Sequence, residues 1–264
     1  MATVRAHGVD VAYTCSGHGP PLVLVHGAGV DGRMWRPQSE GLAAEFTVVA
    51  WDEPGAGRSS DLPPDFTLAD FAHCLAAVIE DVGLGPAHVA GLSWGGTVVL
   101  ELYRHHPELV RTLILVDTYA GWKGSLPPEE VAARVEGVRR MLAAEGEEFD
   151  PTLPGLFAGD PPAAFVPLLD AMARDVRPAT MGAQLFMMAE ADQRDLFPEI
   201  AVPTLLVWGE RDTRSPLGVA RAFRDAIDGA RLVVLPGVGH MSNLEAPEGF
   251  ARAVRGFLHG FRPL

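Results

Sequence analysis

The sequence predicts an α/β protein with a mostly parallel, twisted, eight-stranded sheet, helices on both faces of that sheet and an inserted helical cap. Three observations support this fold class. Short apolar runs recur along the chain, helical patterns separate them, and the alternation breaks only between about residues 120 and 202. Alternating strands and helices are typical of a parallel sheet covered on both faces. The chain has 264 residues, of which 48% are hydrophobic, and this suits one large domain with an insertion.

Eight segments are the expected strands. Six are apolar runs, most of which lack the polar alternation of a half-exposed strand, and this is typical of strands buried on both faces. The runs span residues 21–26, 46–51, 87–92, 111–116, 204–208 and 231–235. The remaining pair lies in residues 4–14, where His7 and Gly8 mark a turn, so this segment is expected to form an antiparallel edge hairpin.

Residue spacing predicts the helices between these strands. In residues 67–82, apolar residues recur at spacings of three and four and form one stripe along a helix. Thr67 can cap the start of this helix, and Gly83 can end it.

The region 120–202 contains no convincing strand. It holds three helical patterns and a proline-rich stretch at 150–162. The helical patterns span residues 127–145, 163–175 and 178–191. We therefore expect a helical cap, or lid, over residues 120–202, inserted into a core that is formed by residues 1–119 and 203–264.

Composition argues against several classes of function. A formal net charge of −13 disfavours nucleic acid as a partner, because phosphate binding needs a basic face. The N-terminal residues lack the apolar core of a signal peptide, and no run of about 18 apolar residues could span a membrane. Cys15 and Cys74 are too few for a disulfide framework or a metal cluster. We expect a cytoplasmic protein that acts on a small molecule with no metal and no cofactor, and the oligomeric state stays open.

The stretch 91–96, Gly-Leu-Ser-Trp-Gly-Gly, carries the strongest functional signal. It follows an apolar run and precedes a helical pattern, so Ser93 lies between glycines at a sharp strand-to-helix turn. Such a nucleophile elbow strains the backbone at the serine, and glycines on either side avoid side-chain clashes. The turn exposes the serine hydroxyl to a histidine that could activate it.

A serine nucleophile needs a base, and the base needs an orienting acid. Asp212 follows the expected strand at 204–208, and His240 follows the expected strand at 231–235. Because parallel strands end at the same edge of a sheet, we expect Ser93, Asp212 and His240 to converge at that edge.

The chain resembles the α/β-hydrolase family over nearly its whole length, because four motifs occur in the family's order. They are His-Gly-Ala-Gly at 26–29, Asp-Glu-Pro-Gly-Ala-Gly-Arg-Ser at 52–59, the elbow, and the pair of Asp212 and His240. By this resemblance, Ser93 attacks the substrate, His240 is the general base and Asp212 orients His240. The resemblance also implies an oxyanion hole made of the backbone N–H groups of Ala28 and Trp94.

Some assignments stay open within that resemblance. Asp117 ends another expected strand and is a rival for the orienting acid, because some family members place the acid there. The Trp94 indole can pack beneath the elbow or form a wall of the pocket. His26 is expected to hold its loop by hydrogen bonds.

Within the family, the run at 237–247 is similar to enol-lactonases and small-molecule esterases. The Ser-Trp-Gly-Gly elbow also resembles proline iminopeptidases, but these carry a His-Gly-Gly-Pro-Gly loop that this chain lacks. We therefore predict a serine hydrolase that cleaves a small ester or lactone through an acyl-enzyme intermediate. Hydrolysis of amide, peptide, thioester or carbon–carbon bonds is one alternative, and a non-hydrolytic binding protein or lyase is the other.

The substrate pocket is expected to be apolar, because methionine and aromatic side chains favour an acyl or ring group. The expected substrate-binding residues are Tyr119, Trp122, Phe186, Met187 and Met241.

Other cap residues allow two interpretations. Met181, Leu185 and Met188 share one helical face, which can serve core packing or line the pocket. Three cap arginines could bind a substrate carboxylate, although no arginine cluster stands out. They are Arg174, Arg177 and Arg194.

Overall fold

A computed structural model of the chain describes residues 1–143 and 154–261. Its centre is one eight-stranded sheet in the order β1-β2-β4-β3-β5-β6-β7-β8. The strands are β1 Ala2–Ala6, β2 Val9–Gly17, β3 Pro21–Val25, β4 Thr47–Trp51, β5 Ala87–Leu92, β6 Val110–Val116, β7 Thr204–Gly209 and β8 Arg231–Leu235. Strand β2 pairs antiparallel with β1 and β4, and the other neighbours are parallel. The predicted fold class is confirmed, including the edge hairpin.

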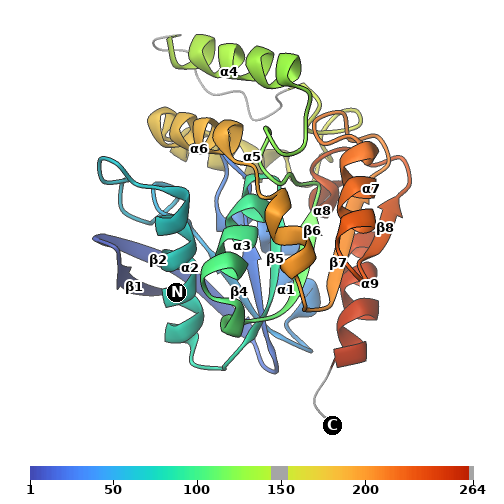
Figure 1. Ribbon diagram of the computed structural model, residues 1–264. Helices are drawn as coiled ribbons and strands as arrows, with labels where there is room; N and C mark the ends of the chain where they lie inside the picture. Colours follow the sequence, from blue (N-terminus) through green and yellow to red (C-terminus); the bar gives the residue numbers. More distant parts are fainter. Residues whose placement is uncertain (144–153, 262–264) are drawn as a thin grey trace.

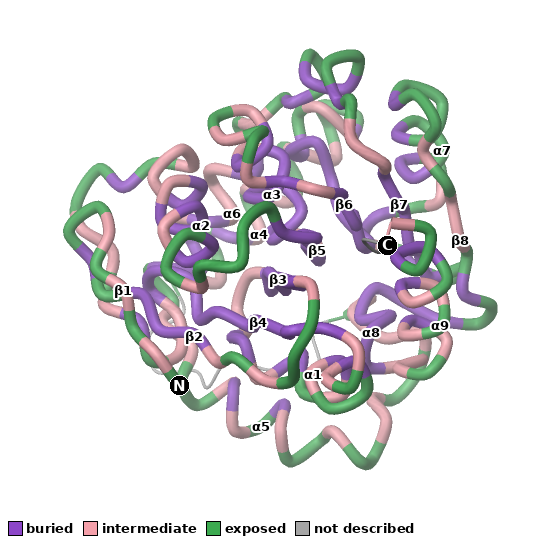
Figure 2. The backbone as a smooth tube through the Cα atoms, turned by 90° about the horizontal axis from the view of Figure 1, so that it is seen from below, coloured by how far each residue is buried: buried purple, intermediate pink, exposed green. Residues whose placement is uncertain are grey.

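Helices cover both faces of this sheet (Figure 1). Those of the core are α1 Arg36–Leu42, α2 Leu68–Val82, α3 Trp94–His105, α7 Leu217–Ala226, α8 Ser242–Glu245 and α9 Pro247–Leu258. One core cluster joins the sheet to α2, α3 and α7, and a second joins the opposite face to α1 and α9. Figure 2 shows how burial varies across the molecule: the central strands are buried, and exposed residues lie on the outer sides of the helices and in the loops.

The inner strands are buried because both of their faces meet helices. Every residue of β3, β4, β5 and β7 is buried, which agrees with their unbroken apolar sequences. Strand β8 lies at the sheet edge and is only partly buried. Helix α2 begins with a capping box between Thr67 and Asp70, and it ends at Gly83, whose φ of 71° suits a glycine C-cap.

Three helices lie between β6 and β7 in the sequence: α4 Pro128–Ala143, α5 Val166–Asp175 and α6 Pro178–Glu190. Figure 1 shows them above the sheet, with α4 outermost and α6 beneath it. Helix α6 buries six residues, whereas α4 buries only Val138. The expected end of the first of these helices and the start of the proline-rich stretch lie outside the described residues.

Short 3₁₀ turns complete the described chain. They are Gly32–Trp35, Pro107–Leu109, Arg194–Glu199 and His259–Phe261. Among the described residues, no helix combines the length and apolar character needed to cross a membrane.

Candidate active site

Ser93 occupies the turn between β5 and α3 in a strained conformation. Its φ of 55° and ψ of −119° are rare for a residue with a side chain, and such a backbone costs on the order of 1–3 kcal/mol. Glycines make the turn possible. A Cβ on Gly91 would lie 2.4 Å from the Gly95 carbonyl oxygen, and one on Gly95 would lie 2.4 Å from that of Val25. The strand and helix therefore approach so closely that these positions accept no side chain.

Two residues, at and just after the end of β6, form hydrogen bonds with the backbone of Ser93. The Ser93 N–H donates to the Val116 carbonyl oxygen over 3.0 Å. The Thr118 hydroxyl donates to the carbonyl oxygen of Ser93, and a Cβ on Gly96 would lie 2.1 Å from that hydroxyl oxygen. Hydrogen bonds on both sides of the serine thus stabilise its unusual backbone.

Asp212 and His240 are brought together from the ends of β7 and β8. The His240 Nδ1 lies 2.8 Å from Asp212 Oδ2, and both side chains are almost fully buried. The other carboxylate oxygen of Asp212 accepts from the backbone N–H groups of Arg214, at 2.8 Å, and Ser215, at 2.9 Å. These contacts fix the carboxylate, which in turn fixes the orientation of the imidazole ring.

Asp117, the rival acid, has a different partner. It follows β6 with a φ of 43°, and its Oδ1 accepts from the Gly209 N–H over 2.7 Å. Burial raises the pKa of the Asp117 carboxyl well above its ordinary value, and the nearby charge of Asp212 raises it further. The structure therefore places Asp212, and not Asp117, against the histidine ring.

Ser93 and His240 line one cavity, which offers about 700 Å³ of space free of protein atoms, counting its open mouth. The two side chains make no direct hydrogen bond within the described structure, and such bonds are often long before substrate binds. The lining residues come from the loop after β3, the elbow, the segment after β6, the segment before α5, helices α5 and α6, and the loops after β7 and β8. They are Gly27, Ala28, Gly29, Val30, Leu92, Ser93, Tyr119, Trp122, Leu156, Leu169, Met181, Leu185, Met188, Arg214, His240 and Met241.

Only three of the five expected substrate-binding residues line the cavity. Tyr119, Trp122 and Met241 line it. Phe186 and Met187 do not, and they pack instead against the core cluster beneath α2 and α3. The reason is helical geometry: each residue turns the chain by about 100°, so the α6 face that carries Met181, Leu185 and Met188 points to the cavity.

The three arginines considered from the sequence lie elsewhere. Arg177 donates to the carbonyl oxygens of Ser59 and Gly57, and Arg194 pairs with Asp192 at 2.6 Å. Neither these two nor Arg174 lines the cavity of Ser93. The arginine that lines it is Arg214, which sequence reasoning missed because it lies in the loop of the core that carries Asp212.

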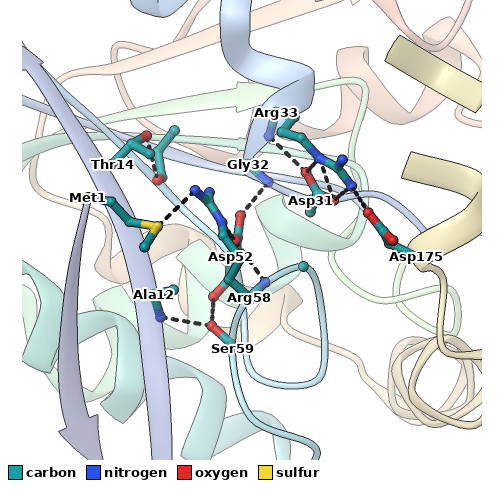
Figure 3. Close-up of polar contacts among 12 residues, drawn as sticks. Met1, Ala12, Thr14, Asp31, Gly32, Arg33, Asp52, Arg58, Ser59 and Asp175 are labelled. Atoms are coloured by element: carbon teal, nitrogen blue, oxygen red, sulfur yellow. Dashed lines mark hydrogen bonds and ion pairs between the residues drawn. The ribbon is translucent and has the colours of Figure 1, made fainter. Parts of the chain in front are cut away.

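The motif at 52–59 contacts the segment after β3 at Gly32 (Figure 3). Asp52 accepts from the Gly32 N–H through Oδ1, at 3.1 Å, and from the Arg58 side chain through Oδ2, at 2.7 Å. Arg33 pairs with Asp31 and reaches Asp175 at the end of α5. These contacts connect the loop after β3 both to the sheet and to the helices above it.

The expected oxyanion donors are the backbone N–H groups of Ala28 and Trp94. Ala28 lines the cavity, and its N–H donates to no acceptor within the described part of the chain. The Trp94 N–H is among the four at the start of α3 that have no partner within that helix. Neither N–H group has an acceptor within the residues that the structure describes.

Comparison with known proteins identifies the family. The sequence matches the model of the alpha/beta hydrolase fold over residues 20–247. The chain belongs to the alpha/beta hydrolase family. It is 30% identical over 262 residues to a putative carbamate hydrolase, RutD, of Azorhizobium caulinodans, covering 96% of this chain and 97% of the relative.

Solved structures of other alpha/beta hydrolases are similar along the whole chain. A thermophilic esterase from Thermogutta terrifontis is 30% identical with a TM-score of 0.84, and the match covers 99% of this chain and 97% of that one. The enol-lactonase from Burkholderia xenovorans LB400 is 28% identical with a TM-score of 0.80, covering 98% and 100% of the two chains. The resemblance expected from the sequence motifs is thus confirmed at the level of family.

In this alpha/beta hydrolase, the side chain of Trp94 lies under the elbow. Its indole is fully buried, does not line the cavity, and donates to Glu53 Oε2 over 2.7 Å. The other oxygen of Glu53 accepts from the Gln184 amide of α6 at 2.6 Å. His26 completes the cluster, because its Nε2 accepts from the Glu53 N–H at 3.1 Å. Burial raises the pKa of the Glu53 carboxyl and lowers that of the His26 imidazole.

A second polar cluster of the hydrolase lies beside the cavity. Arg134 of α4 donates to the Tyr119 hydroxyl at 2.9 Å and stands 5.5 Å and 5.3 Å from the ring centroids of Tyr119 and Trp122. Arg134 also pairs with Glu130 at 2.6 Å and donates to the Arg214 carbonyl oxygen at 2.7 Å. Cation–π contacts from Arg134 of α4 therefore stabilise the positions of Tyr119 and Trp122 in the cavity wall.

Proposed function

We propose that this chain is a serine hydrolase that cleaves a small ester or lactone through an acyl-enzyme intermediate on Ser93. The observation that carries the proposal is the 2.8 Å contact between Asp212 and His240, because His240 lines the same cavity as Ser93. The strained conformation of Ser93 supports it, because such strain is concentrated at functional sites. Membership of a family with esterase and enol-lactonase relatives agrees with this chemistry.

The steps follow from the roles proposed for the three side chains. His240 takes the proton of the Ser93 hydroxyl, and the oxygen attacks the carbonyl carbon of the substrate. Asp212 stabilises the imidazolium that forms. Collapse of the tetrahedral intermediate expels the alcohol, which receives the proton from His240. Water then attacks the acyl group by the same route and restores the Ser93 hydroxyl.

The N–H groups of Ala28 and Trp94 are the proposed oxyanion hole. Negative charge develops on the carbonyl oxygen only as the tetrahedral intermediate forms, so donors fixed in advance stabilise the transition state selectively. Removal of one such donor costs on the order of 3 kcal/mol in other enzymes. Two fixed backbone groups suit this role because folding has already oriented them.

Residues 120–202 are proposed to act as a cap over this site, with the boundaries expected from the sequence. Support comes from the cavity, to which α6 contributes Met181, Leu185 and Met188. Because most lining side chains are apolar, we propose that the cavity accepts a small apolar acyl or ring group.

Covalent labelling tests the proposal most directly. A fluorophosphonate should modify the wild-type protein at Ser93, as located by peptide mass spectrometry, and Ser93→Ala should not react. His240→Ala should lose both labelling and turnover of p-nitrophenyl esters, whereas His18→Ala, a change of an exposed histidine, should keep both. A folded wild-type protein that resists the reagent at neutral pH would contradict the proposed nucleophile.

Carbamate hydrolysis is the second candidate, because a relative that matches almost the whole chain is named as a putative carbamate hydrolase. Ser93, activated by His240 and Asp212, would attack a carbamate carbonyl in the same way. An ester, an amide and a thioester with one common acyl chain, and a carbamate in which NH replaces the α-carbon of that chain, would rank the bonds by kcat/KM. If the ester is not turned over fastest, the assignment of bond class is wrong.

A further inference from the structure

Arg214 is the one permanently charged side chain among the described residues that line the cavity of Ser93 and His240. It lies two residues after Asp212 in the loop that follows β7, and its backbone N–H donates to Asp212 Oδ1 at 2.8 Å. The loop after β7 therefore carries both Asp212, which contacts His240, and Arg214, which lines the mostly apolar cavity.

The guanidinium has few protein partners. Its Nη1 donates to the Pro154 carbonyl oxygen over 3.3 Å, and within the described residues it forms no ion pair. A guanidinium carries five N–H donors and stays charged at any physiological pH. The carboxylate nearest in sequence, Asp212, is already occupied by His240 and two backbone N–H groups. Most of the donor capacity of Arg214 is therefore left for a ligand or water.

A second guanidinium strengthens the positive potential at this end of the cavity. Arg134 donates to the Arg214 carbonyl oxygen, and it has Glu130 as its own carboxylate partner. Among the described residues, Arg134 therefore has a carboxylate partner and Arg214 has none. The chain as a whole carries a formal charge of −13, which would repel an anion, so a local positive site is needed to hold one.

We propose that Arg214 binds a carboxylate of the substrate, so that the preferred ester or lactone is anionic and not neutral. This inference rests on the proposed hydrolase function. A planar guanidinium can form two parallel hydrogen bonds with a carboxylate, which gives orientation as well as affinity.

Tyr119 connects the proposed base with the loop that carries Arg214. The ring of Tyr119 lies 6.5 Å from that of His240, centroid to centroid, and the Tyr119 hydroxyl donates to the Arg214 carbonyl oxygen. Tyr119 therefore lies near the proposed base and holds the backbone of Arg214. We choose substrates with a few carbons between the scissile carbonyl and the carboxylate for the first test.

Binding can be measured without turnover by using Ser93→Ala protein. Monomethyl glutarate and methyl valerate have the same length and differ only in the distal carboxylate. By isothermal calorimetry, monomethyl glutarate should bind at least tenfold more tightly. Adding Arg214→Gln should abolish the difference, and Arg211→Gln should not, because Arg211 is an exposed arginine of the same loop that lies outside the cavity lining.

Kinetics provide the second measurement. In wild-type protein, p-nitrophenyl hemiglutarate should have at least a tenfold higher kcat/KM than p-nitrophenyl valerate. Arg214→Gln should lower the value for the anionic ester tenfold or more, chiefly through KM, and change that for the neutral ester less than threefold. Arg214→Lys should restore part of the preference, since it returns the charge but not the planar donor pair. The pair 4-acetoxybenzoate and 4-methylphenyl acetate tests a carboxylate on the alcohol side.

The outcomes separate this inference from the function on which it rests. An Arg214-dependent preference for the anionic member of either ester pair supports it. Equal losses for neutral and anionic esters in Arg214→Gln, or no preference in the wild type, would overturn it even if Ser93 is labelled. If Ser93 is not labelled and no ester is cleaved, the hydrolase proposal is wrong, and calorimetry still reports whether Arg214 binds a carboxylate.

Discussion

The indole N–H of Trp94 donates to the carboxyl group of Glu53 over 2.7 Å, and both side chains are fully buried. Trp94 follows the proposed nucleophile, and its own backbone N–H is a proposed oxyanion donor. Glu53 also accepts from Gln184 of α6. One buried carboxyl therefore connects the elbow, the motif at 52–59 and the helical insertion.

Removal of that indole N–H should weaken both folding and catalysis. Trp94→Phe keeps an aromatic ring but leaves one Glu53 oxygen without its donor, which should lower the free energy of unfolding by about 1–3 kcal/mol. Because the Trp94 backbone should also shift, we expect kcat to fall more than KM rises. Urea denaturation and steady-state ester kinetics measure the two effects. Trp35→Phe is the matched control, since the buried Trp35 indole N–H has no partner among the described residues. A larger loss in the control would refute this explanation.

Asp212 and the rival acid Asp117 should respond differently to the same change. Asp212→Asn removes the charge that faces the imidazole, and kcat should fall by a factor on the order of 10⁴, as in other serine triads. Asp117→Asn should retain most activity, because the raised pKa of Asp117 already favours its neutral form and an amide oxygen can still accept from Gly209. Ester kinetics at neutral pH compare the variants, and a collapse of activity in Asp117→Asn would assign the orienting role to that residue.

Stability should fall in mild acid because of His88. This histidine is buried in β5 beside the Thr112 hydroxyl, at 2.9 Å, and burial, with a smaller contribution from Arg111, lowers its pKa from 6.5 to about 4. The unfolded chain binds this proton below about pH 6.5 and the native chain only near pH 4, so the free energy of unfolding decreases as pH falls between these values. The loss reaches about 3 kcal/mol, at about 1.4 kcal/mol per pKa unit.

The variant His88→Gln tests this account through urea titrations at several pH values. It should flatten the dependence between pH 6.5 and 4, and the exposed His18→Gln should leave the dependence unchanged. An unaltered slope in His88→Gln would mean that other groups control acid stability.

The contacts in Figure 3 should differ in their contribution to stability according to burial. Asp52 is almost fully buried and accepts from Gly32 and Arg58, so Asp52→Asn should lower the free energy of unfolding by about 2–3 kcal/mol. Asp175 is half exposed in its pair with Arg33, so Asp175→Asn should cost less than about 1 kcal/mol. Chemical denaturation of both variants gives the comparison, and similar losses would argue against burial as the deciding factor.

The sequence predicted the parts of this molecule that depend on local pattern. Strands such as β5 and β7 could be recognised because both faces are buried, and their sequences are continuously apolar. Ser93, Asp212 and His240 could be connected because each follows a parallel strand. The contact of Glu53 with Gln184 could not, since 131 residues separate them and neither position carries a pattern that specifies a partner.

The cavity lining was harder to predict because it depends on how α6 is rotated. Phe186 and Met187 have suitable chemistry, but packing turns their neighbours Leu185 and Met188 toward Ser93 instead. Arg214 carries no sequence signal at all, because a loop arginine is usually solvated and only the fold brings this one to the cavity.

Trp122 has a consequence for how this protein can be observed. It is one of five tryptophans and lies in the wall of the cavity, with the Arg134 guanidinium 5.3 Å from its ring centroid. The other four are fully buried and do not line that cavity. The intrinsic fluorescence of Trp122 should therefore change selectively when a ligand enters, so stopped-flow emission can follow substrate arrival in real time without an attached dye.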